Sequence, residues 1–298
     1  MSAAKPGRLA AWRMAARLPT LPAAAAPVAV GTAVALRDDA FAAGPALAAL
    51  FGALCLQVGA NFANDVFDHE RGADTPDRLG PPRASQLGLL TPSELKRGMW
   101  AAFGLATLAG LYLAWVGGWP VVAVGLASIA AAIIYTGGPW PIGYHALGDL
   151  FTFVFFGLAA VMGTFYVQAG TLTWFSFAAA VPVGAMVTMI LVVNNLRDIA
   201  TDARAGKTTL AVVLGERRTR WWFAALLALA AGVQAGAAGL GAVPWGAVSA
   251  LATVGLAWPL LRRVLGETRG RELNPVLKAT ARFALLASLA WAAAIAAG

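Results

Sequence analysis

The chain has 298 residues, of which 59% belong to the hydrophobic set and only 12% are charged. A soluble domain carries roughly 25% charged residues, so this composition excludes an ordinary soluble enzyme and a disordered chain. The net charge of +8 would suit nucleic acid in a soluble protein. Here the basic residues fall between long apolar blocks, where membrane orientation explains them better, so we expect no nucleic-acid partner.

Nine apolar blocks follow one another along the chain, each close to the ~20 residues that cross a bilayer as a helix. The blocks lie near residues 20–37, 43–66, 96–116, 119–136, 147–168, 173–196, 218–239, 244–262 and 276–297. They leave no room for a separate soluble domain, so we expect an all-α fold of nine transmembrane helices in a single domain, 1–298. The basic segment 1–19 is expected either as an interfacial helix, with Trp12 at the lipid headgroups, or as a frayed tail.

Basic residues gather in alternate connections between these blocks. They precede the first block and follow the second, the sixth and the eighth. The connections on the opposite side contain a single basic residue, Arg37. The positive-inside rule then predicts a cytoplasmic N-terminus.

The second block carries a stripe of polar side chains toward its cytoplasmic end. At a helical spacing of i, i+4, i+8 and i+11, the stripe contains Gln57, Asn61, Asp65 and Asp68. Asn64 lies alongside, and Asp74 follows a few residues later. The sixth block ends in a similar way, because Asn194, Asp198 and Asp202 share one helix face and Asn195 is adjacent.

Two carboxylate pairs at matched helix ends suit Mg²⁺, which proteins usually hold with one or two carboxylates completed by phosphate oxygens and water. Basic side chains beside them are natural partners for a diphosphate. These candidates are Arg71, Arg78, Arg83, Arg197 and Lys207. Acid and base interleaved at a membrane surface predict a site for a phosphorylated lipid. The alternative is that these are solvated loop charges and helix caps, and the positive-inside rule alone would place each Arg here.

The segment 135–149 contains four Gly and two Pro and joins the fourth and fifth blocks without any Lys or Arg. This composition predicts a rigid turn, and the absence of basic residues indicates that the turn covers something apolar. Tyr135, Trp140 and Tyr144 could line an acceptor pocket or shield a cation, or they could belong to an interfacial aromatic belt. Asp149 could act in catalysis or simply favour the start of the fifth helix.

Together these segments resemble the UbiA superfamily of intramembrane prenyltransferases. Its two aspartate motifs match Asn64-Asp65-x-x-Asp68 and Asp198-x-x-x-Asp202. Other stretches are similar to the branch that prenylates 1,4-dihydroxy-2-naphthoate in menaquinone synthesis. They are Ala16-Arg17-x-Pro-Thr-Leu-Pro22, Gly80-Pro-x-Arg83, Tyr135-Thr-Gly-Gly-Pro139, Asn194-Asn-x-Arg-Asp198 and Gly206-Lys207-Thr-Thr-Leu210.

The resemblance implies nine helices around a central cavity in a bacterial inner membrane, with the active site on the cytoplasmic side. It implies Mg²⁺-dependent transfer of a polyprenyl group from polyprenyl diphosphate to 1,4-dihydroxy-2-naphthoate, with decarboxylation to demethylmenaquinone. The expected catalytic and metal residues are Asp65, Asp68, Asp198 and Asp202, with Asp149 as a candidate base and Asp74 as a further ligand. Diphosphate is expected at Asn64, Asn194, Asn195 and the basic residues given above. The acceptor or prenyl pocket is expected at Gln57, Asn61, Tyr135, Trp140 and Tyr144.

Two alternatives remain open at this point. Other members of the superfamily use 4-hydroxybenzoate, homogentisate, a chlorophyllide or haem as acceptor. Intramembrane carboxylates also mark ion-coupled transporters, but transporter sites lie near the bilayer midplane, whereas these carboxylates cluster at helix ends.

Overall fold

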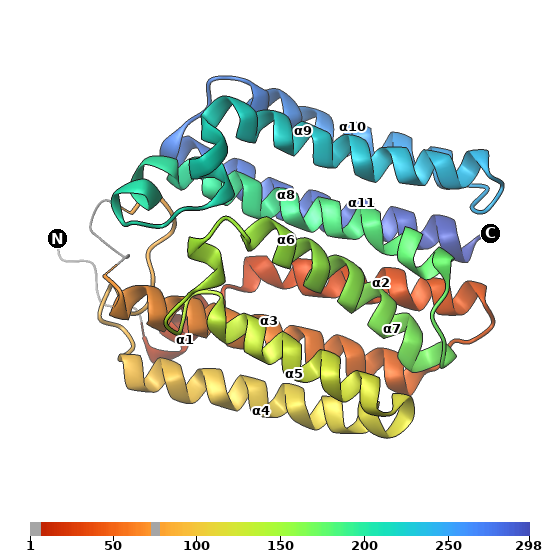
Figure 1. Cartoon of the computed structure of the whole chain (residues 1–298), viewed down its shortest axis with the longest axis horizontal. Helices are drawn as coiled ribbons and strands as arrows, with labels where there is room; N and C mark the ends of the chain where they lie inside the picture. Colours follow the sequence, from red (N-terminus) through yellow and green to blue (C-terminus); the bar gives the residue numbers. More distant parts are fainter. Residues whose placement is uncertain (1–6, 73–77) are drawn as a thin grey trace.

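The computed structural model describes residues 7–72 and 78–298, and its helices run side by side along the long axis of the molecule (Figure 1). Short α1 (Arg8–Ala16) and a 3-10 turn (Leu18–Thr20) precede the long helices. These are α2 (Leu21–Arg37), α3 (Ala43–Glu70), α4 (Pro92–Gly117), α5 (Trp119–Ile134), α8 (Trp174–Arg204), α9 (Leu210–Gly239), α10 (Gly246–Leu265) and α11 (Leu273–Ala296). Between α5 and α8, α6 (Gly148–Thr152), the π-helix Phe153–Ala159 and α7 (Ala160–Ala169) form one continuous run.

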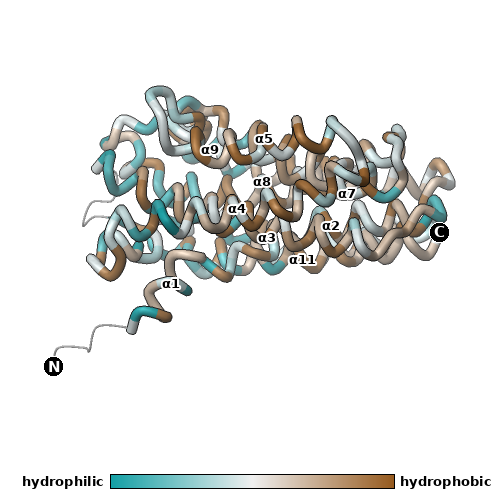
Figure 2. Tube along the Cα trace, turned by 90° about the horizontal axis from the view of Figure 1, so that it is seen from below, coloured by the Kyte–Doolittle hydropathy of each residue, from teal (hydrophilic) through white to brown (hydrophobic). Residues whose placement is uncertain are grey.

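The all-α prediction is confirmed, and within the described ranges each of the nine expected spans coincides with a helical run. Eight of these runs are long and apolar enough to cross a membrane, while α5, with 16 residues, is shorter. The middle of the bundle is apolar and its polar residues gather at the ends (Figure 2). Because α3 and α8 continue past the expected ends at 66 and 196, both aspartate clusters lie on helices and not in connections.

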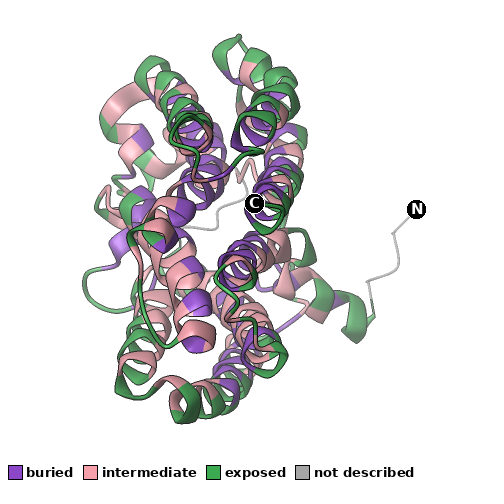
Figure 3. Ribbon diagram, turned by 90° about the vertical axis from the view of Figure 1, so that its right-hand side faces the viewer, coloured by how far each residue is buried: buried purple, intermediate pink, exposed green. Residues whose placement is uncertain are grey.

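Helix α8 occupies the centre of the bundle. In its most apolar stretch 72% of the residues are buried, compared with 28% in α4 and in α9. Methionines on α8, including Met186 and Met189, pack against Phe223 of α9 and Phe283 of α11. Buried residues face inward and exposed residues face outward around this centre (Figure 3). The second aspartate cluster therefore continues from the most enclosed helix of the molecule.

The π-helix brings the α6–α7 run into backbone contact with α8. A Cβ atom on Gly157 would lie 2.5 Å from the Cα atom of Gly184, so both helices need glycine at this crossing. π-Helical turns are rare and often occur next to functional sites, because they shift the register of the residues before and after them. Here the shift directly follows the turn that carries Asp149.

The N-terminal segment forms a short helix whose tryptophan packs on the bundle. Residues 8–16 do form α1, but Trp12 packs edge-on against Phe62 of α3 with ring centroids 5.5 Å apart, and it also lies against Gly98 of α4. Trp12 is therefore a packing residue. Helix α1 ends at Ala16, and the next residue, Arg17, adopts a left-handed conformation with φ of 50°.

Candidate active site

The two aspartate motifs lie at the same end of the bundle, where α3 and α8 both finish (the left side of Figure 1). Asp68 on α3 is close enough for its charge to act on Asp202 of α8. The prediction that the two carboxylate pairs face one another is therefore consistent with the arrangement of these helices. We call this end of the molecule the polar end.

The first motif is built into the connection that follows it. Asp65 is 1% exposed, and its carboxylate accepts hydrogen bonds from the Ser85 hydroxyl and from the backbone N–H groups of Ala84 (3.3 Å) and Ser85 (3.4 Å). Asp68 accepts from Arg83 Nη2 at 2.6 Å and from the Tyr144 hydroxyl at 3.0 Å. Asp65 thus fixes the connection over the site, and Asp68 is oriented by two partners from different connections.

The second motif is held from within its own helix. Arg197 donates to both oxygens of Asp198, from Nε at 2.8 Å and from Nη2 at 2.5 Å. The same guanidinium donates to Asn194 and to Asn274 of α11, both at 2.9 Å. Asn274 in turn donates to the Leu79 carbonyl at 2.9 Å. Arg197 is only 3% exposed, so it positions Asp198 and ties α8 to its neighbours, in contrast to the open diphosphate ligand that the sequence predicts.

Asp202 is the carboxylate whose hydrogen-bonding positions are not filled by other described residues. Lys207 Nζ is 3.8 Å from Oδ1, and Oδ2 is buried without a hydrogen-bond partner. Asn195, also expected at the diphosphate, is 3% exposed one helical face away. The described residues form no group of three or more metal-ligating side chains. A hard cation bound by one carboxylate from each motif and completed by phosphate oxygens fits this donor set.

Two cationic side chains lie beside the Tyr144 ring, as expected for an aromatic residue that shields a cation. Arg71 lies 5.6 Å from the ring centroid and Lys207 lies 5.5 Å from it. Arg71 also donates to the carbonyls of Thr136 (2.9 Å) and Gly138, so it anchors the segment 135–149. Burial and the nearby Asp68 charge raise the pKa of Tyr144, which keeps its hydroxyl protonated as a donor.

The segment 135–149 is joined to the connection after α8. Ala146 N–H donates to the Thr208 carbonyl at 2.7 Å, and Thr208 N–H donates to the Tyr144 carbonyl at 3.1 Å. Asn64, at the end of α3, accepts from the Thr136 hydroxyl at 3.0 Å. Three connections therefore form one cover over the aspartate motifs.

Three residues expected at the acceptor or prenyl pocket make other contacts in the structure. Gln57 and Asn61 donate to the Thr20 hydroxyl, and Asn61 also donates to the Ala16 carbonyl at 2.9 Å. Their amides hold the turn after α1 against α3, which is a structural role. Trp140 is 55% exposed and stacks on His145, with centroids 4.0 Å apart, so it faces away from the site.

Arg17 lies near the first aspartate motif, although the sequence indicates no site role for it beyond its place in the family-like stretch Ala16-Arg17-x-Pro-Thr-Leu-Pro22. The charges of Asp65 and Asp68, and of Arg78 and Arg83, all act on its guanidinium. Its Nη2 atom is buried without a hydrogen-bond partner. The signal in the sequence was the stretch Ala16-Arg17-x-Pro-Thr-Leu-Pro22, and the structure adds that the amides of Gln57 and Asn61 hold the turn that contains it.

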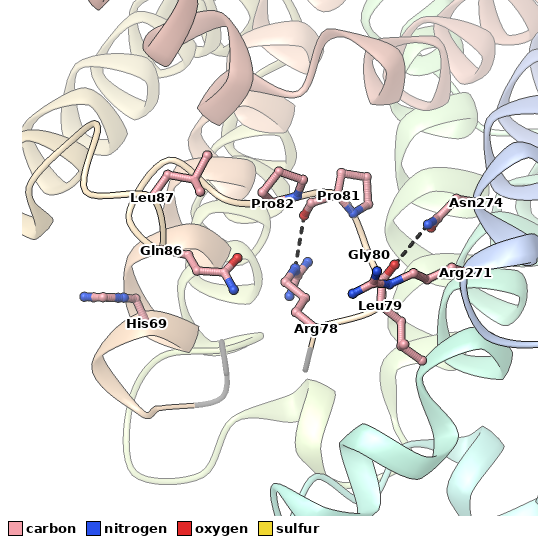
Figure 4. A pocket seen from close by; sticks show the side chains of 10 residues that line it. All are labelled: His69, Arg78, Leu79, Gly80, Pro81, Pro82, Gln86, Leu87, Arg271 and Asn274. Atoms are coloured by element: carbon pink, nitrogen blue, oxygen red, sulfur yellow. Dashed lines mark hydrogen bonds between the residues drawn. The ribbon is translucent and has the colours of Figure 1, made fainter. Parts of the chain in front are cut away.

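A cavity of about 690 Å³ opens at the polar end beside this cover (Figure 4). It lies between the end of α3, the described part of the α3–α4 connection and the start of α11. Arg78 points into it and donates from Nε to the Pro81 carbonyl at 3.1 Å (Figure 4). Arg271 lines the opposite wall. Asp74 lies outside the described residues.

Tyr135 and Asp149 lie together at the inner side of the cover. The Tyr135 ring rests on Gly143, and its hydroxyl is 2.8 Å from where a Cβ atom of Gly148 would lie. Asp149 is 5% exposed and accepts a hydrogen bond from Trp222 Nε1 of α9 at 3.1 Å. Burial, followed by the charges of Asp149 and the motif aspartates, raises the pKa of Tyr135. The structure thus brings both predicted residues together and adds Trp222.

Solved structures of low sequence identity share the fold. An apo UbiA homologue from Aeropyrum pernix K1 has a TM-score of 0.70 at 16% identity, covering 92% of this chain and 96% of that one. A UbiA homologue from Archaeoglobus fulgidus, bound to GPP and Mg²⁺, has a TM-score of 0.65 at 15% identity, covering 96% and 99%.

Relatives of known name match most of the chain. The 1,4-dihydroxy-2-naphthoate octaprenyltransferase of Mycobacterium tuberculosis is 46% identical over 291 residues, which cover 96% of both chains. The Escherichia coli protein of the same name is 38% identical over 234 residues, covering 74% of this chain and 73% of that one. The model of the UbiA prenyltransferase family matches residues 24–273. These matches and the apolar helices indicate an integral multi-pass membrane protein and leave the transporter alternative without support. The chain belongs to the UbiA prenyltransferase family.

Proposed function

We propose that the protein transfers a polyprenyl group from polyprenyl diphosphate to 1,4-dihydroxy-2-naphthoate, with loss of the carboxylate as CO₂ and formation of demethylmenaquinol, the reduced form of demethylmenaquinone. The observation that carries the choice of acceptor is the 46% identity over 96% of the chain to a naphthoate octaprenyltransferase. The facing aspartate motifs support the reaction class, because breaking an allylic diphosphate ester leaves negative charge that must be stabilised.

Asp68 and Asp202 are the carboxylates assigned to Mg²⁺, with Asp65 and Asp198 holding the surrounding connections and helix end in place. Asp202 fits this role because its Oδ2 atom is buried without a partner. Bound Mg²⁺ supplies Lewis-acid stabilisation of the diphosphate as it leaves. Asp74 remains a candidate ligand.

The basic residues of the site take different roles. Arg17 and Lys207 are assigned to the diphosphate, since Arg17 has an unpartnered buried nitrogen and Lys207 lies beside Asp202. Arg78 points into the cavity through which a diphosphate headgroup would reach them (Figure 4). Arg71, Arg83 and Arg197 are assigned to positioning the cover and the aspartates.

The cover formed by the three connections excludes water from the reacting centre. An allylic cation that met water would be quenched to an alcohol, so a closed apolar surrounding is part of the chemistry. The backbone hydrogen bonds between Ala146, Thr208 and Tyr144 hold the cover shut. Asn64 and Asn194 are assigned to orienting carboxylates and phosphate oxygens, and the buried Asn195 remains a candidate for the same role.

We place the whole chain, 1–298, in one membrane domain of a bacterial inner membrane, with the N-terminus and the polar end on the cytoplasmic side. The support is the charge asymmetry, since the connections at the other end contain only Arg37. In a Cys55→Ala background, Arg204→Cys should react with a membrane-impermeant maleimide only in inside-out vesicles. Leu240→Cys, 87% exposed at the other end, should react only in right-side-out vesicles. The reverse pattern would overturn the orientation.

A prenyl-transfer assay on the protein in nanodiscs tests the function. Polyprenyl diphosphate and Mg²⁺ are supplied with 1,4-dihydroxy-2-naphthoate or with 4-hydroxybenzoate, and EDTA serves as the metal control. We expect a prenylated naphthoquinone and CO₂ with naphthoate alone, and only with metal. Product with hydroxybenzoate alone would keep the family chemistry and overturn the acceptor.

A further inference from the structure

The reaction proposed above requires that the acceptor ring give up a hydroxyl proton, and the aspartate motifs are occupied with the donor. Asp149 offers a carboxylate apart from those motifs. It lies on the first turn of α6, is 5% exposed, and has Trp222 as its only side-chain hydrogen-bond partner among the described residues. A carboxylate offers about four lone-pair positions, so a substrate hydroxyl finds acceptor capacity here.

Tyr135 supplies a hydroxyl donor at the same place. Two glycines fix its ring, because Gly143 lies under Cε1 and Gly148 lies against the hydroxyl. Any side chain at either position would displace the ring. Within the described part of the chain, the Tyr135 hydroxyl makes no hydrogen bond, although the residue is only partly exposed. Its raised pKa keeps it protonated, so it acts as a donor over the ordinary pH range.

The position of this pair relative to the aspartate motifs is suited to transfer. The charges of Asp149, Asp68 and Asp202 all act on the Tyr135 hydroxyl, with Asp149 the strongest of the three. The Tyr135 hydroxyl lies against Gly148, the residue directly before Asp149, and Tyr144 of the same segment donates to Asp68. The segment 135–149 therefore joins this pair to the first aspartate motif.

We propose that Asp149 and Tyr135 hold one phenolic oxygen of the acceptor, with Asp149 accepting the hydroxyl proton, Tyr135 donating a hydrogen bond to the same oxygen, and Trp222 positioning the Asp149 carboxylate. This inference rests on the proposed function for its reaction class, and applies to any phenolic acceptor. Asp149 and Tyr135 are then catalytic residues and Trp222 is a positioning residue.

The transfer step balances with these groups alone. The acceptor O–H bond breaks and its proton goes to an Asp149 oxygen, while the Tyr135 hydrogen bond stabilises the charge that develops on the aryl oxygen. The ring π electrons form the new carbon–carbon bond to the allylic carbon and leave a ketone at the aryl oxygen. Loss of CO₂ from naphthoate, or of a ring proton from another phenol, then returns the electron pair that restores the aromatic ring. The allylic C–O bond breaks, and its electron pair leaves with the diphosphate.

The pH dependence provides a readout that a purely structural role would not change. The groups that face Asp149 and Tyr135 are Trp222 from α9, which does not titrate, and the charged Asp68 from α3 and Asp202 from α8. In wild type, turnover should rise with pH until Asp149 is ionised and then remain level. With Asp149→Asn, turnover should instead keep rising with pH, because it then depends on ionisation of the acceptor itself.

The experiment compares Asp149→Asn, Tyr135→Phe and Trp222→Phe in nanodiscs, using whichever of the naphthoate or hydroxybenzoate acceptors wild type prenylates. Trp221→Phe is the matched control, because Trp221 is the neighbouring indole and is 60% exposed. Tyr166→Phe controls for loss of a tyrosine hydroxyl that instead bonds the Gly117 carbonyl. KM is measured separately for donor and acceptor, and release of diphosphate from the donor is measured without acceptor.

We expect Asp149→Asn to lower turnover by about 100-fold or more, with the pH profile changed and the donor KM unchanged. Tyr135→Phe and Trp222→Phe should each raise the acceptor KM or lower kcat by about 10-fold, while both controls behave as wild type. An unchanged acceptor KM and pH profile in all three variants would overturn the inference. If the wild type prenylates hydroxybenzoate and not naphthoate, that result would overturn only the function proposed above. If Asp149→Asn fails to fold, Trp222→Phe tests the inference instead. A raised acceptor KM with an unchanged donor KM supports it, and an unchanged acceptor KM overturns it.

Discussion

The ends of α3 and α8 carry the same motif chemistry but support it differently. At the end of α3, Asp65 and Asp68 are oriented by partners from outside their helix, namely Ser85, Arg83 and Tyr144. At the end of α8, Asp198 is held by the adjacent Arg197, and Asp202 keeps a buried oxygen without a partner. The difference teaches that the α3 motif also assembles the cover, whereas the α8 motif leaves capacity for a ligand.

The largest expected effect comes from removing one carboxylate at each end. Asp202→Asn should lower turnover by at least about 1,000-fold, since the Mg²⁺ that stabilises the leaving diphosphate is held less well. Asp65→Asn should also lower turnover, since the connection over the site is no longer fixed. Only Asp65→Asn should also lower the thermal unfolding temperature, because it disrupts a carboxylate that accepts three hydrogen bonds worth about 1.5–3 kcal/mol each. Turnover and unfolding in detergent are measured together. Asp38→Asn, an exposed residue at the other end of α2, is the control. Equal destabilisation by both variants would remove the distinction between the two ends.

A smaller effect on turnover, but a large effect on stability, is expected at Arg83. Arg83→Met leaves Asp68 buried without its cation, and breaking such a pair costs about 3–5 kcal/mol. The free energy of unfolding is the measurement. The exposed Arg204→Met should leave it unchanged. If Arg83→Met were as stable as wild type, Arg83 would have no part in holding the cover.

Arg17 tests whether the N-terminal turn serves the donor. Arg17→Met should raise the KM for polyprenyl diphosphate by about 10- to 100-fold, as expected for one charge-assisted contact, and leave the acceptor KM unchanged. Arg13→Met, one turn earlier and exposed, should have no effect. An effect on the acceptor alone would contradict the assignment of Arg17 to the diphosphate.

The smallest expected effect is at Tyr144. Tyr144→Phe keeps the ring beside Arg71 and Lys207 but removes the hydrogen bond to Asp68, so the loss in kcat/KM should be about 3- to 10-fold. Burial and Asp68 disfavour the charged phenolate, which raises the pKa, so the hydroxyl stays protonated. The ratio of wild type to variant should therefore be constant between about pH 6 and pH 9. A ratio that collapses within that range would show a titrating Tyr144.

The sequence was sufficient for the parts of the fold that depend on local pattern. Apolar block length predicts the spans, and the spacing of Asp65 with Asp68 and of Asp198 with Asp202 predicts two carboxylate pairs at helix ends. The family resemblance rests on these same residues and is confirmed. The exact helix ends were missed, since hydropathy falls before α3 and α8 finish.

What the sequence could not supply is the choice of partner for each polar side chain. Arg197 and Lys207 look alike in the sequence, yet one is buried against Asp198 and the other lies beside Asp202. Gln57 and Asn61 continue the stripe of Asp65, but they bind a turn that reaches α3 from earlier in the chain. Trp222 lies in an apolar helix with no motif around it, and only the fold brings it to Asp149.

The central claim is that Asp68 and Asp202 act together on one metal-bound diphosphate. The direct test is a double-mutant cycle on the binding of geranyl thiolodiphosphate, an unreactive donor analogue, to the protein in nanodiscs with Mg²⁺ and with EDTA. The account predicts that Asp68→Asn and Asp202→Asn each remove the Mg²⁺-dependent part of the affinity, and that the double variant loses no more. Losses that simply add, or Mg²⁺-dependent binding that survives either substitution, would contradict it.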